Sequence, residues 1–413
     1  MTKPDQSFDV LIVGAGQAGG NAAIALRQAG FEGSIALAGD EPDAPYERPP
    51  LSKEYLSGEK PAERLALRPL HFWADKGVEL KLGHAITRVD AEARTATDSL
   101  GHVYGWQHLI WATGGSPRPL PVKGADLDGI HSIRNRADVD ALKVELPVAE
   151  RIAVIGGGYI GLEAAAVLTK LGKKVTVLEA MDRVLARVTA EPVSRFFEDL
   201  HRSHGVDIRL GVTVDHLVGT NKGAVSGVML KDGTQIDCEL VIVGIGIIPA
   251  VAPLAAAGAK VGNGVEVDEF CRTSLEGVYA IGDCAAHENA FADGARIRLE
   301  SVQNANDQAR VVAAAITGNA APYHAVPWFW SNQYDLRLQT VGLSTGYDAT
   351  VLRGDVAARA FSLVYLKEGR VIALDCVGAV KDYVQGRALV EKGVKADPAK
   401  LADTSILLKD LAQ

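Results

Sequence analysis

Residues 10–19 read VLIVGAGQAG, an apolar run typical of a β-strand followed directly by a glycine-rich turn. A second copy of this pattern, IAVIGGGYIG, occupies residues 152–161, and an alanine-rich segment typical of a helix follows each copy. Glycines at the G-x-G-x-x-G spacing let the strand turn sharply, let the backbone approach a pyrophosphate, and let the helix pack close to the strand. The phosphates would meet free N–H groups at the start of the helix. Two copies in this context predict two dinucleotide sites in one chain.

The similarity between the two halves continues beyond the turns. Residues 77–83 (GVELKLG) match residues 205–211 (GVDIRLG) in chemistry, and both lead into alternating, hairpin-like stretches. Both halves then reach an apolar strand that ends in glycine, at residues 109–114 (LIWATG) and 241–246 (VIVGIG). An internal duplication explains these matches better than the convergence of two ordinary α/β units.

Composition and charge restrict the class of protein. With 413 residues, 47% of them apolar and 23% charged, the chain is typical of a globular protein of two or three domains. Its net charge of -8 argues against binding to nucleic acid or to an anionic membrane. A single lysine precedes Phe8, so we expect no signal peptide and a cytoplasmic protein.

Two further features argue against a membrane span and a metal site. Residues 240–259 are uncharged and long enough to cross a bilayer, but Pro249, Pro253 and several glycines interrupt them. We therefore expect a buried strand, a turn and a short helix there. The four cysteines are far apart and form no CxxC pair, so we expect reduced, buried thiols and no metal centre. His201 and His204 are expected to be solvated at a polar helix end.

The order of the segments predicts the domain organisation. Residues 278–283 (VYAIGD) read as a short strand that would complete the first sheet, so the chain should leave the first domain and return to it. From Pro327 the pattern changes to alternating strands and then a helix at 383–392. We predict an α/β protein with two Rossmann-like dinucleotide-binding domains, residues 1–118 with 246–326 and residues 119–245, plus a small C-terminal α/β domain, residues 327–413.

An acidic residue indicates which nicotinamide dinucleotide binds the second domain. Glu179 ends the strand after the second glycine turn, where a carboxylate accepts from a ribose 2′-OH and repels a 2′-phosphate, which favours NADH over NADPH. Arg183 and Arg187 lie nearby and could each contact a phosphate. In the first domain the corresponding acid, Asp40, is displaced by about one position, so its contact with the ribose is less secure.

Four further segments carry a resemblance to a known family. They are residues 46–53 (YERPPLSK), 282–284 (GDC), 300–305 (ESVQNA) and 327–331 (PWFWS). With the two glycine turns, they make the chain similar to the flavoprotein reductases related to glutathione reductase. Within that group it resembles the bacterial ferredoxin reductases of cytochrome P450 and ring-hydroxylating dioxygenase systems. The resemblance implies FAD in the first domain and NADH in the second.

The resemblance also implies roles for individual residues. Lys53 would lie near the flavin N5, and Glu163 near the nicotinamide would hold it in place, so these two are the candidate catalytic residues. Tyr159 would cover the flavin, and Trp330 would lie over the flavin ring near solvent. The candidate FAD-binding residues are Gly14, Ala15, Gly16, Ala18, Gly19, Asp40, Lys53, Ile86, Thr113, Gly114, Arg134, Asp283, Val302 and Trp330. The candidate NAD-binding residues are Gly156, Gly158, Tyr159, Ile160, Gly161, Glu163, Glu179, Arg187 and Gly246.

Two other functions share this fold or these motifs. NADH oxidases, NADH peroxidases and coenzyme A disulfide reductases need a redox-active cysteine beside the flavin, whereas this chain has Ser52 after the Pro-Pro-Leu turn and no cysteine before Cys238. A flavoprotein that resembles apoptosis-inducing factor would act by binding and turn over slowly. Both remain open as alternatives to the ferredoxin reductase.

A ferredoxin partner sets requirements on the surface. The resemblance implies a small [2Fe–2S] ferredoxin, usually acidic, while this chain is itself at -8, so the attraction must come from a local basic patch. Arg310 is the candidate docking residue. Arg64 and Arg68, four residues apart, are expected on one helix face.

Overall fold

The computed structural model describes residues 4–412 and divides into two compact units. The first unit comprises the described residues up to Glu47 together with Ala62–Ser116 and Ile248–Pro327. The second comprises Arg48–Pro61, Pro117–Ile247 and the described residues from Trp328 onward. The chain therefore leaves the first unit and returns to it, while the finer division into three domains stays a prediction.

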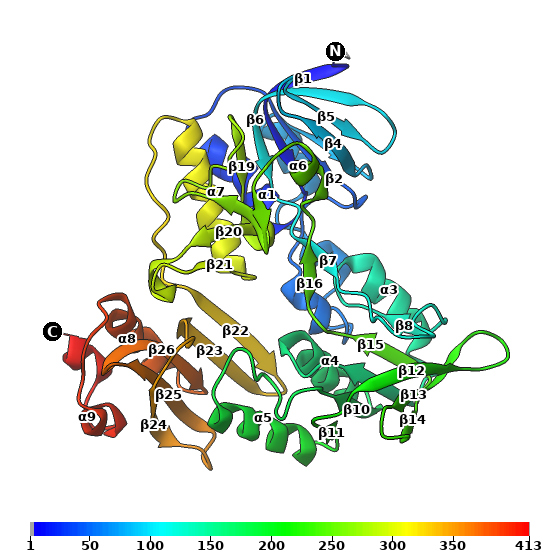
Figure 1. Ribbon diagram of the computed structural model, residues 1–413, viewed down its shortest axis with the longest axis vertical. Coiled ribbons are helices and arrows are strands. Elements are labelled where there is room, and N and C mark those ends of the chain that lie inside the picture. The colour runs from blue at the N-terminus through cyan, green and yellow to red at the C-terminus, as the bar shows by residue number, and fades with distance from the viewer. Residues whose placement is uncertain (1–3, 413) are drawn as a thin grey trace. The chain divides into compact units, whose positions relative to one another are not determined.

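The first unit contains a largely parallel sheet, which Figure 1 shows with its connections. The strand order is β3 (Val78–Leu82), β2 (Ile35–Gly39), β1 (Gln6–Val13), β6 (Val103–Trp111), β5 (Thr95–Asp98) and β4 (Ile86–Asp90). Strand β19 (Val278–Ala280) also pairs with β6, in parallel. The strand expected at 278–283 therefore joins the first sheet, with β6 between it and the strand that carries the glycine turn.

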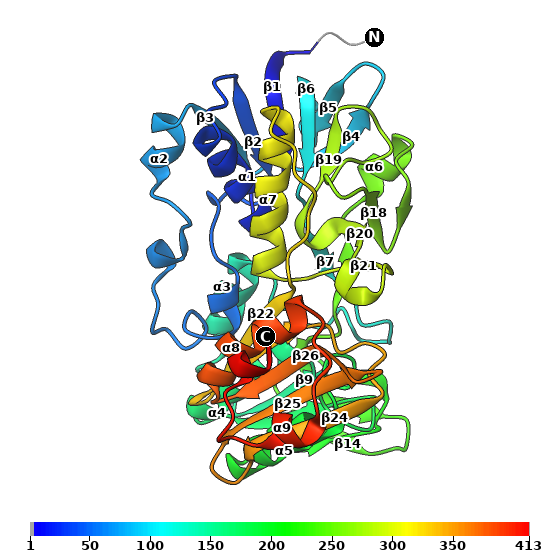
Figure 2. The same cartoon turned by 90° about the vertical axis from the view of Figure 1, so that its left-hand side faces the viewer.

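Two helices cover one face of this sheet. Helices α1 (Gln17–Gln28) and α7 (Val302–Ile316) pack against each other, and Figure 2 shows them side by side in front of the sheet. The core beneath them is almost wholly apolar, with Val10, Ile12 and Ile110 fully buried. Small residues, alanine and glycine, make up most of the buried face of α1, whereas α7 buries alanines together with the amide side chains of Gln303, Asn304 and Gln308.

Shorter elements complete the first unit. A four-stranded sheet runs in the order β17 (Val261–Gly262), β18 (Gly264–Val267), β20 (Ala285–Glu288) and β21 (Arg296–Arg298). The remaining elements are η2 (Ala62–Leu65), α2 (Leu70–Asp75), α6 (Ala252–Ala256), η3 (Gly282–Cys284) and η4 (Ala290–Ala292). Strands β7 (Gly115–Pro117) and β16 (Ile247–Pro249), where the chain passes between units, pair with each other.

The second unit repeats the arrangement of the first around the second glycine turn. Its parallel sheet has the order β11 (Asp207–Arg209), β10 (Lys174–Leu178), β9 (Arg151–Ile155), β15 (Leu240–Val243) and β8 (Ile130–His131). Its helices are α3 (Arg136–Glu145), α4 (Tyr159–Lys170) and α5 (Glu191–Ser203). An antiparallel meander, β12 (Val214–Gly219), β13 (Val225–Leu230) and β14 (Gln235–Asp237), turns at Gly233, where φ is +87°.

The C-terminal part of the second unit is an antiparallel sheet covered by helices. The strand order is β22 (Trp328–Gln333), β23 (Leu336–Gly342), β26 (Arg370–Val377), β25 (Ala360–Lys367) and β24 (Ala349–Asp355). Helices α8 (Val380–Glu391), α9 (Pro398–Ala402) and η5 (Leu408–Ala412) follow. The segment Arg48–Pro61 also belongs to this unit and holds η1 (Pro49–Ser52).

The structure corrects two local expectations. Arg64 lies in the short helix η2, but Arg68 follows it in a loop, so the two do not share a helix face. The Arg68 guanidinium instead donates to the Leu67 carbonyl and lies over the Phe72 ring. His201 is fully buried rather than solvated, because it faces inward from the last turn of α5, whereas His204 is exposed as expected.

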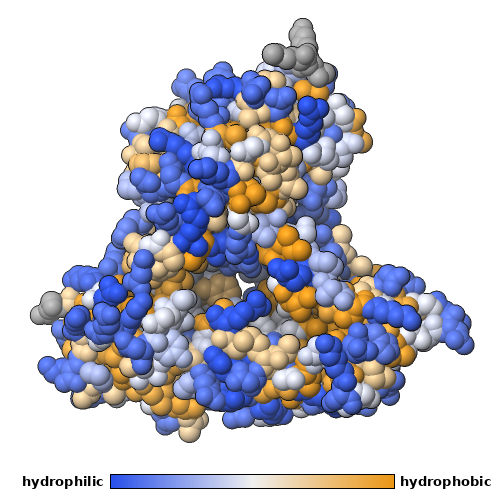
Figure 3. All heavy atoms as spheres, in the orientation of Figure 1, coloured by the Kyte–Doolittle hydropathy of each residue, from blue (hydrophilic) through white to orange (hydrophobic). Residues whose placement is uncertain are grey.

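The uncharged segment 240–259 forms β15, β16 and α6, as expected from its prolines and glycines. Among residues 4–412 no helix is long and apolar enough to cross a membrane. On the face seen in Figure 3, apolar residues lie between hydrophilic ones over most of the area.

Candidate functional site

The first glycine turn has a backbone that only glycine can adopt. Gly14 follows β1 with φ +110°, and a Cβ there would lie 2.3 Å from the Ala112 carbonyl oxygen. A Cβ on Gly19 would lie 1.9 Å from the Gly14 carbonyl oxygen. With any other residue at position 19, the helix could therefore not start so close to the strand. The two glycines thus perform the local tasks that the fingerprint predicts.

Other predicted FAD residues gather around this turn. Thr113 and Gly114 follow β6 beside Gly14, and the Thr113 hydroxyl donates to the Ala250 carbonyl at 2.8 Å. On the other side, a Cβ on Gly282 would lie 2.9 Å from the Ala18 side chain, which brings half-buried Asp283 next to α1. The first unit therefore brings together the glycine turn, the end of β6 and Asp283.

The remaining predicted FAD residues of the first unit lie further along the sheet. Asp40 is exposed directly after β2, next to Gly39, whose added Cβ would lie 2.6 Å from the Ala15 side chain. Ile86 is buried at the start of β4. Val302 is the first residue of α7, after the Ser301 cap.

The start of α1 is suited to an anionic group. Its cap residue, Gly16, offers no side-chain oxygen, so the first N–H groups of the helix have no side-chain cap. Gln17, the first helical residue, donates from its amide to Asn306 at 3.0 Å and thereby ties α1 to α7. A pyrophosphate is a chemical fit for uncapped N–H groups beside a turn in which Gly14 and Gly19 admit no side chain.

The second glycine turn has the same geometry. Gly156 has φ +110°, and a Cβ on Gly161 would lie 2.1 Å from the Gly156 carbonyl oxygen. Gly158 caps α4 without a side-chain bond, and a Cβ there would meet nothing within 4 Å. The space before α4 is therefore open, as a second dinucleotide requires. Exposed Ile160 lies in the first turn of α4, and Gly246 follows β15 with φ +95°.

Glu179 bonds directly to the second glycine turn. One carboxylate oxygen accepts from the Gly157 N–H at 2.6 Å, and the other accepts from the Met181 N–H at 2.8 Å. The side chain is half-buried at the end of β10. A carboxylate can accept about four hydrogen bonds, so both oxygens keep capacity for a ribose hydroxyl.

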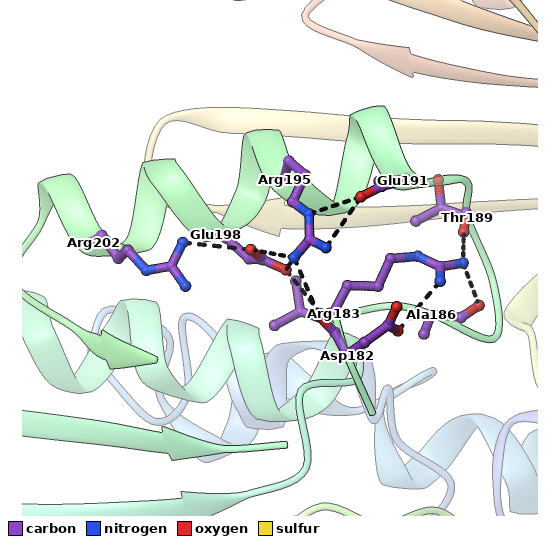
Figure 4. Close-up of polar contacts among 9 residues, drawn as sticks. Asp182, Arg183, Ala186, Thr189, Glu191, Arg195, Glu198 and Arg202 are labelled. Carbon is purple, nitrogen blue, oxygen red and sulfur yellow. Dashed lines mark hydrogen bonds and ion pairs between the residues drawn. The ribbon is translucent and has the colours of Figure 1, made fainter. Parts of the chain in front are cut away.

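The loop after Glu179 carries both candidate arginines, and Figure 4 shows the contacts of one of them, Arg183. Arg183 points back to its own loop and donates to the carbonyls of Ala186 and Thr189, at 3.1 and 3.4 Å. Buried Glu198 of α5 accepts from the Val184 N–H at 3.2 Å and so anchors the same loop. Arg187 is exposed, so it rather than Arg183 has its side chain available for a phosphate.

The candidate catalytic residues form a buried ion pair within the second unit. Lys53 and Glu163 are in direct contact, with side chains 11% and 2% exposed. The same carboxylate accepts from the Ser52 hydroxyl at 2.6 Å, and its other oxygen accepts from the Ser331 hydroxyl at 2.7 Å. Glu163 is therefore no ordinary charge on a helix face, because three donors from two other segments converge on it.

Aromatic side chains lie close to this ion pair in sequence and structure. Tyr159 of α4 packs against Phe329 of β22, with ring centroids 4.6 Å apart. Burial, followed by the charges of Asp375 and Glu163, raises the pKa of Tyr159 well above its usual value. Half-buried Trp330 lies 6.3 Å from Phe329 and 5.6 Å from Trp328, centroid to centroid. Tyr159 and Trp330 thus belong to one aromatic group, although Tyr159 also has an ordinary packing contact.

Arg134 lies before α3 in the same unit. Its N–H donates to Asp138 at 2.9 Å, and its carbonyl accepts from the Arg48 guanidinium at 2.7 Å. These bonds join the loop that carries Lys53 to the start of α3, so the backbone of Arg134 has a positioning role.

All four cysteines lie among the described residues, and all are buried and unpaired by disulfides. Burial raises the pKa of Cys238 and of Cys376 to about 12 and raises the pKa of Cys271 and Cys284 as well. Thiols in such surroundings stay protonated and are poor nucleophiles.

One cluster in the first unit could in principle hold a metal ion. The ligand atoms of His84, Asp98 and His102 all lie within 4.8 Å of one another. However, both Asp98 oxygens are already used, by the N–H groups of Leu100 and His102 and by the His102 ring and Tyr104 hydroxyl. These bonds lower the pKa of Asp98 to about 2 despite its burial and account for the cluster without a metal.

Two known protein families match this chain. Residues 8–309 match the family described as pyridine nucleotide-disulphide oxidoreductase, and residues 328–412 match one described as reductase C-terminal. The chain belongs to the pyridine nucleotide-disulphide oxidoreductase family. It is therefore an oxidoreductase that uses FAD and NAD(P)H, which confirms the fold class and the cofactor classes expected from the sequence. The choice of NADH over NADPH stays a prediction.

Relatives and solved structures point to one kind of reductase within this family. The chain is 58% identical over 404 residues, 98% of each protein, to the 5,5'-dehydrodivanillate O-demethylase ferredoxin reductase subunit of Sphingobium sp. (strain NBRC 103272 / SYK-6). It is similar, with TM-score 0.95 and 41% identity over 99% of this chain and 100% of the other, to the ferredoxin reductase for the CYP199A2 system from Rhodopseudomonas palustris. A covalent putidaredoxin reductase–putidaredoxin complex gives TM-score 0.94 and 40% identity, over 99% and 98% of the two chains. These findings confirm the resemblance to bacterial ferredoxin reductases.

Proposed function

We propose that this chain is an NADH-dependent ferredoxin reductase that passes electrons through FAD to a [2Fe–2S] ferredoxin serving a cytochrome P450 or ring-hydroxylating dioxygenase. The names of its relatives support this function, since they are reductases of an O-demethylase and of a CYP199A2 system. The observation that carries the proposal is Ser52. It occupies the position after the Pro-Pro-Leu turn, is buried, and donates to Glu163.

The first glycine turn with Asp40, Thr113 and Asp283 would hold FAD, and the second turn with Glu179 and Arg187 would hold NADH. FAD, when bound, accepts a hydride from NADH and passes electrons on one at a time. The protein contributes position and charge. Lys53 would place a cation near the flavin N5, where developing negative charge on the ring needs stabilisation. Glu163 holds that cation in place through the buried ion pair.

Glu179 would make the site selective for NADH. Its carboxylate is fixed by two backbone N–H groups, so it cannot easily turn away from a 2′-phosphate. A like charge held near that phosphate would weaken NADPH binding.

The alternative functions lack support from the side chains. A disulfide reductase, an NADH oxidase or an NADH peroxidase of this fold needs a reactive thiolate, and the four thiols here are buried with raised pKa values. An interaction protein that turns over slowly would not need Lys53 and Glu163 as a buried pair, because burying two charges costs free energy without a matching gain in stability.

The partner would dock through local positive charge. Arg310 lies on α7 with a 71% exposed side chain, and its guanidinium bonds to Asp307 one turn earlier at 2.8 Å. An acidic ferredoxin would therefore have to compete with Asp307 for this arginine. The net charge of -8 disfavours nucleic acid and anionic membrane surfaces as partners. A cytoplasmic location fits a ferredoxin partner.

The acceptor class is tested with the FAD-loaded protein and NADH without oxygen. Small [2Fe–2S] ferredoxins, coenzyme A disulfide and hydrogen peroxide are offered in turn, and NADH oxidation is followed at 340 nm. Rapid NADH oxidation with a ferredoxin and slow oxidation with the other two supports the proposal. Rapid turnover with the disulfide or the peroxide, and none with ferredoxins, would replace it by one of the alternatives.

A further inference from the structure

A chain of hydrogen bonds within the second unit ends at Glu163. Ser331 donates its hydroxyl proton to the carboxylate at 2.7 Å, and the Gln333 side-chain amide donates to the Ser331 oxygen at 3.2 Å. His201 then bonds through its Nε2 to the Gln333 carbonyl oxygen at 2.8 Å. Ser331, Gln333 and His201 are each 1% exposed or less, and they come from β22 and α5.

The direction of each bond in the chain is determined by its partner. The Gln333 carbonyl can only accept, so the Nε2 of His201 carries a proton. The His201 Nδ1 can then accept from the Tyr334 hydroxyl, 3.1 Å away. Burial lowers the pKa of His201 to about 4, so the imidazole is neutral, as this pattern requires. Every donor in the chain therefore points toward Glu163.

A chain with this polarity favours a charged acceptor at its end. Hydrogen bonds to a charged group are stronger than those between neutral groups, and successive bonds in a buried chain polarise one another. The carboxylate end also meets the Lys53 ammonium and the Ser52 hydroxyl, so both of its oxygens are fixed. The amide of Gln333 does not readily relay protons, so the chain suits orientation rather than proton transfer.

We propose that Ser331, Gln333 and His201 are positioning residues that fix the Glu163 carboxylate and, through it, the Lys53 ammonium for hydride transfer. This inference rests on the proposed function, in which Lys53 and Glu163 act in that step. The same residues also join β22 to α4 and α5, so the test has to separate orientation from stability.

The experiment measures reduction of the FAD-loaded protein by NADH in an anaerobic single-turnover assay, which gives a limiting rate and an NADH dissociation constant. Ser331→Ala should lower the limiting rate by about tenfold, the effect of losing one hydrogen bond to a charged group, and leave the dissociation constant unchanged. Ser331→Thr, which keeps the hydroxyl, should restore most of the rate. Ser194→Ala is the matched control, because Ser194 is also fully buried in this unit and its hydroxyl has no partner.

A second variant tests whether the residues act as one chain. Gln333→Met should slow the reaction less than Ser331→Ala, and the double variant should be no slower than Ser331→Ala alone, because the chain is already broken at its first link. A limiting rate for Ser331→Ala equal to that of the Ser194→Ala control would overturn the inference. So would a loss confined to the dissociation constant, or independent losses that multiply in the double variant.

Glu163→Gln distinguishes this inference from the proposed function. If Glu163→Gln leaves the limiting rate unchanged, the proposed role of Glu163 fails and the hydrogen-bond chain that ends at it has no role in hydride transfer. If Glu163→Gln slows the reaction and Ser331→Ala does not, the proposed function stands and the inference about the chain is wrong.

Discussion

Replacing Glu179 with glutamine should shift the preference of the protein from NADH toward NADPH. The wild-type carboxylate accepts from two backbone N–H groups and lies half-buried at the end of β10. Like charges about 4 Å apart repel by about 1 kcal/mol in water and by about 4 kcal/mol near a protein surface. A half-buried carboxylate falls between these limits, so its removal should favour NADPH by roughly 1.4 to 2.8 kcal/mol, which is about tenfold to a hundredfold.

The assay compares kcat/KM for the two donors with ferricyanide as acceptor, and the ratio of the two values is the specificity. Glutamine keeps one carbonyl oxygen, so it also loses one of the two backbone bonds, and the thermal midpoint should fall. Asp207→Asn is the control, since Asp207 is an exposed carboxylate on the neighbouring strand β11 and should leave the ratio unchanged. A ratio that stays constant while the midpoint falls would show that Glu179 only anchors the glycine turn. Equal kcat/KM for both donors in the unmodified protein would refute the reasoning from the start.

Four further outcomes are expected. The purified protein should be yellow, and acid precipitation should release about one equivalent of intact FAD per chain; flavin that stays attached to the precipitate would contradict noncovalent binding. No thiol should react with a disulfide reagent until the protein is denatured, after which all four should react, because the cysteines are buried. Burial raises the pKa of Asp375 to about 6, so its contribution to stability is present near pH 4 and is lost as the pH rises through 6. The thermal midpoint of the wild type relative to Asp375→Asn should therefore fall over that interval, and a constant difference would disprove the shift. Arg310→Glu should slow ferredoxin-dependent cytochrome c reduction and weaken its salt sensitivity while sparing ferricyanide reduction. Arg88 is about as exposed as Arg310, and Arg88→Glu should change neither the rate of cytochrome c reduction nor its salt sensitivity.

The features predicted well from sequence are those set by local backbone geometry. Gly14 and Gly156 stand where a Cβ would collide with a neighbouring carbonyl, so their spacing alone identifies both turns and the helices behind them. The apolar runs of β1 and β9 and the helical pattern after each turn follow from the same local constraints. Local patterns also identified β23, β25 and β26.

The features that escaped prediction depend on contacts between distant segments. Ser331 reaches Glu163 across 168 residues, and buried His201 meets Gln333 across 132, so the polar sequence around each gave no sign of burial. Strand β22 contains three consecutive aromatic residues rather than an alternating pattern, so its position in the sheet was not apparent. The pairing of Lys53 with Glu163 came from the family resemblance, because spacing in one chain cannot show that two segments meet.

The proposed ferredoxin reductase activity is tested most directly by NADH-dependent reduction of cytochrome c by the FAD-loaded protein, with and without a purified [2Fe–2S] ferredoxin. A ferredoxin reductase should give a slow rate without ferredoxin and a rate that rises with ferredoxin concentration and then saturates. Across a panel of acidic [2Fe–2S] ferredoxins, the absence of any rate above the ferredoxin-free background, in a protein that NADH still reduces, would contradict this function.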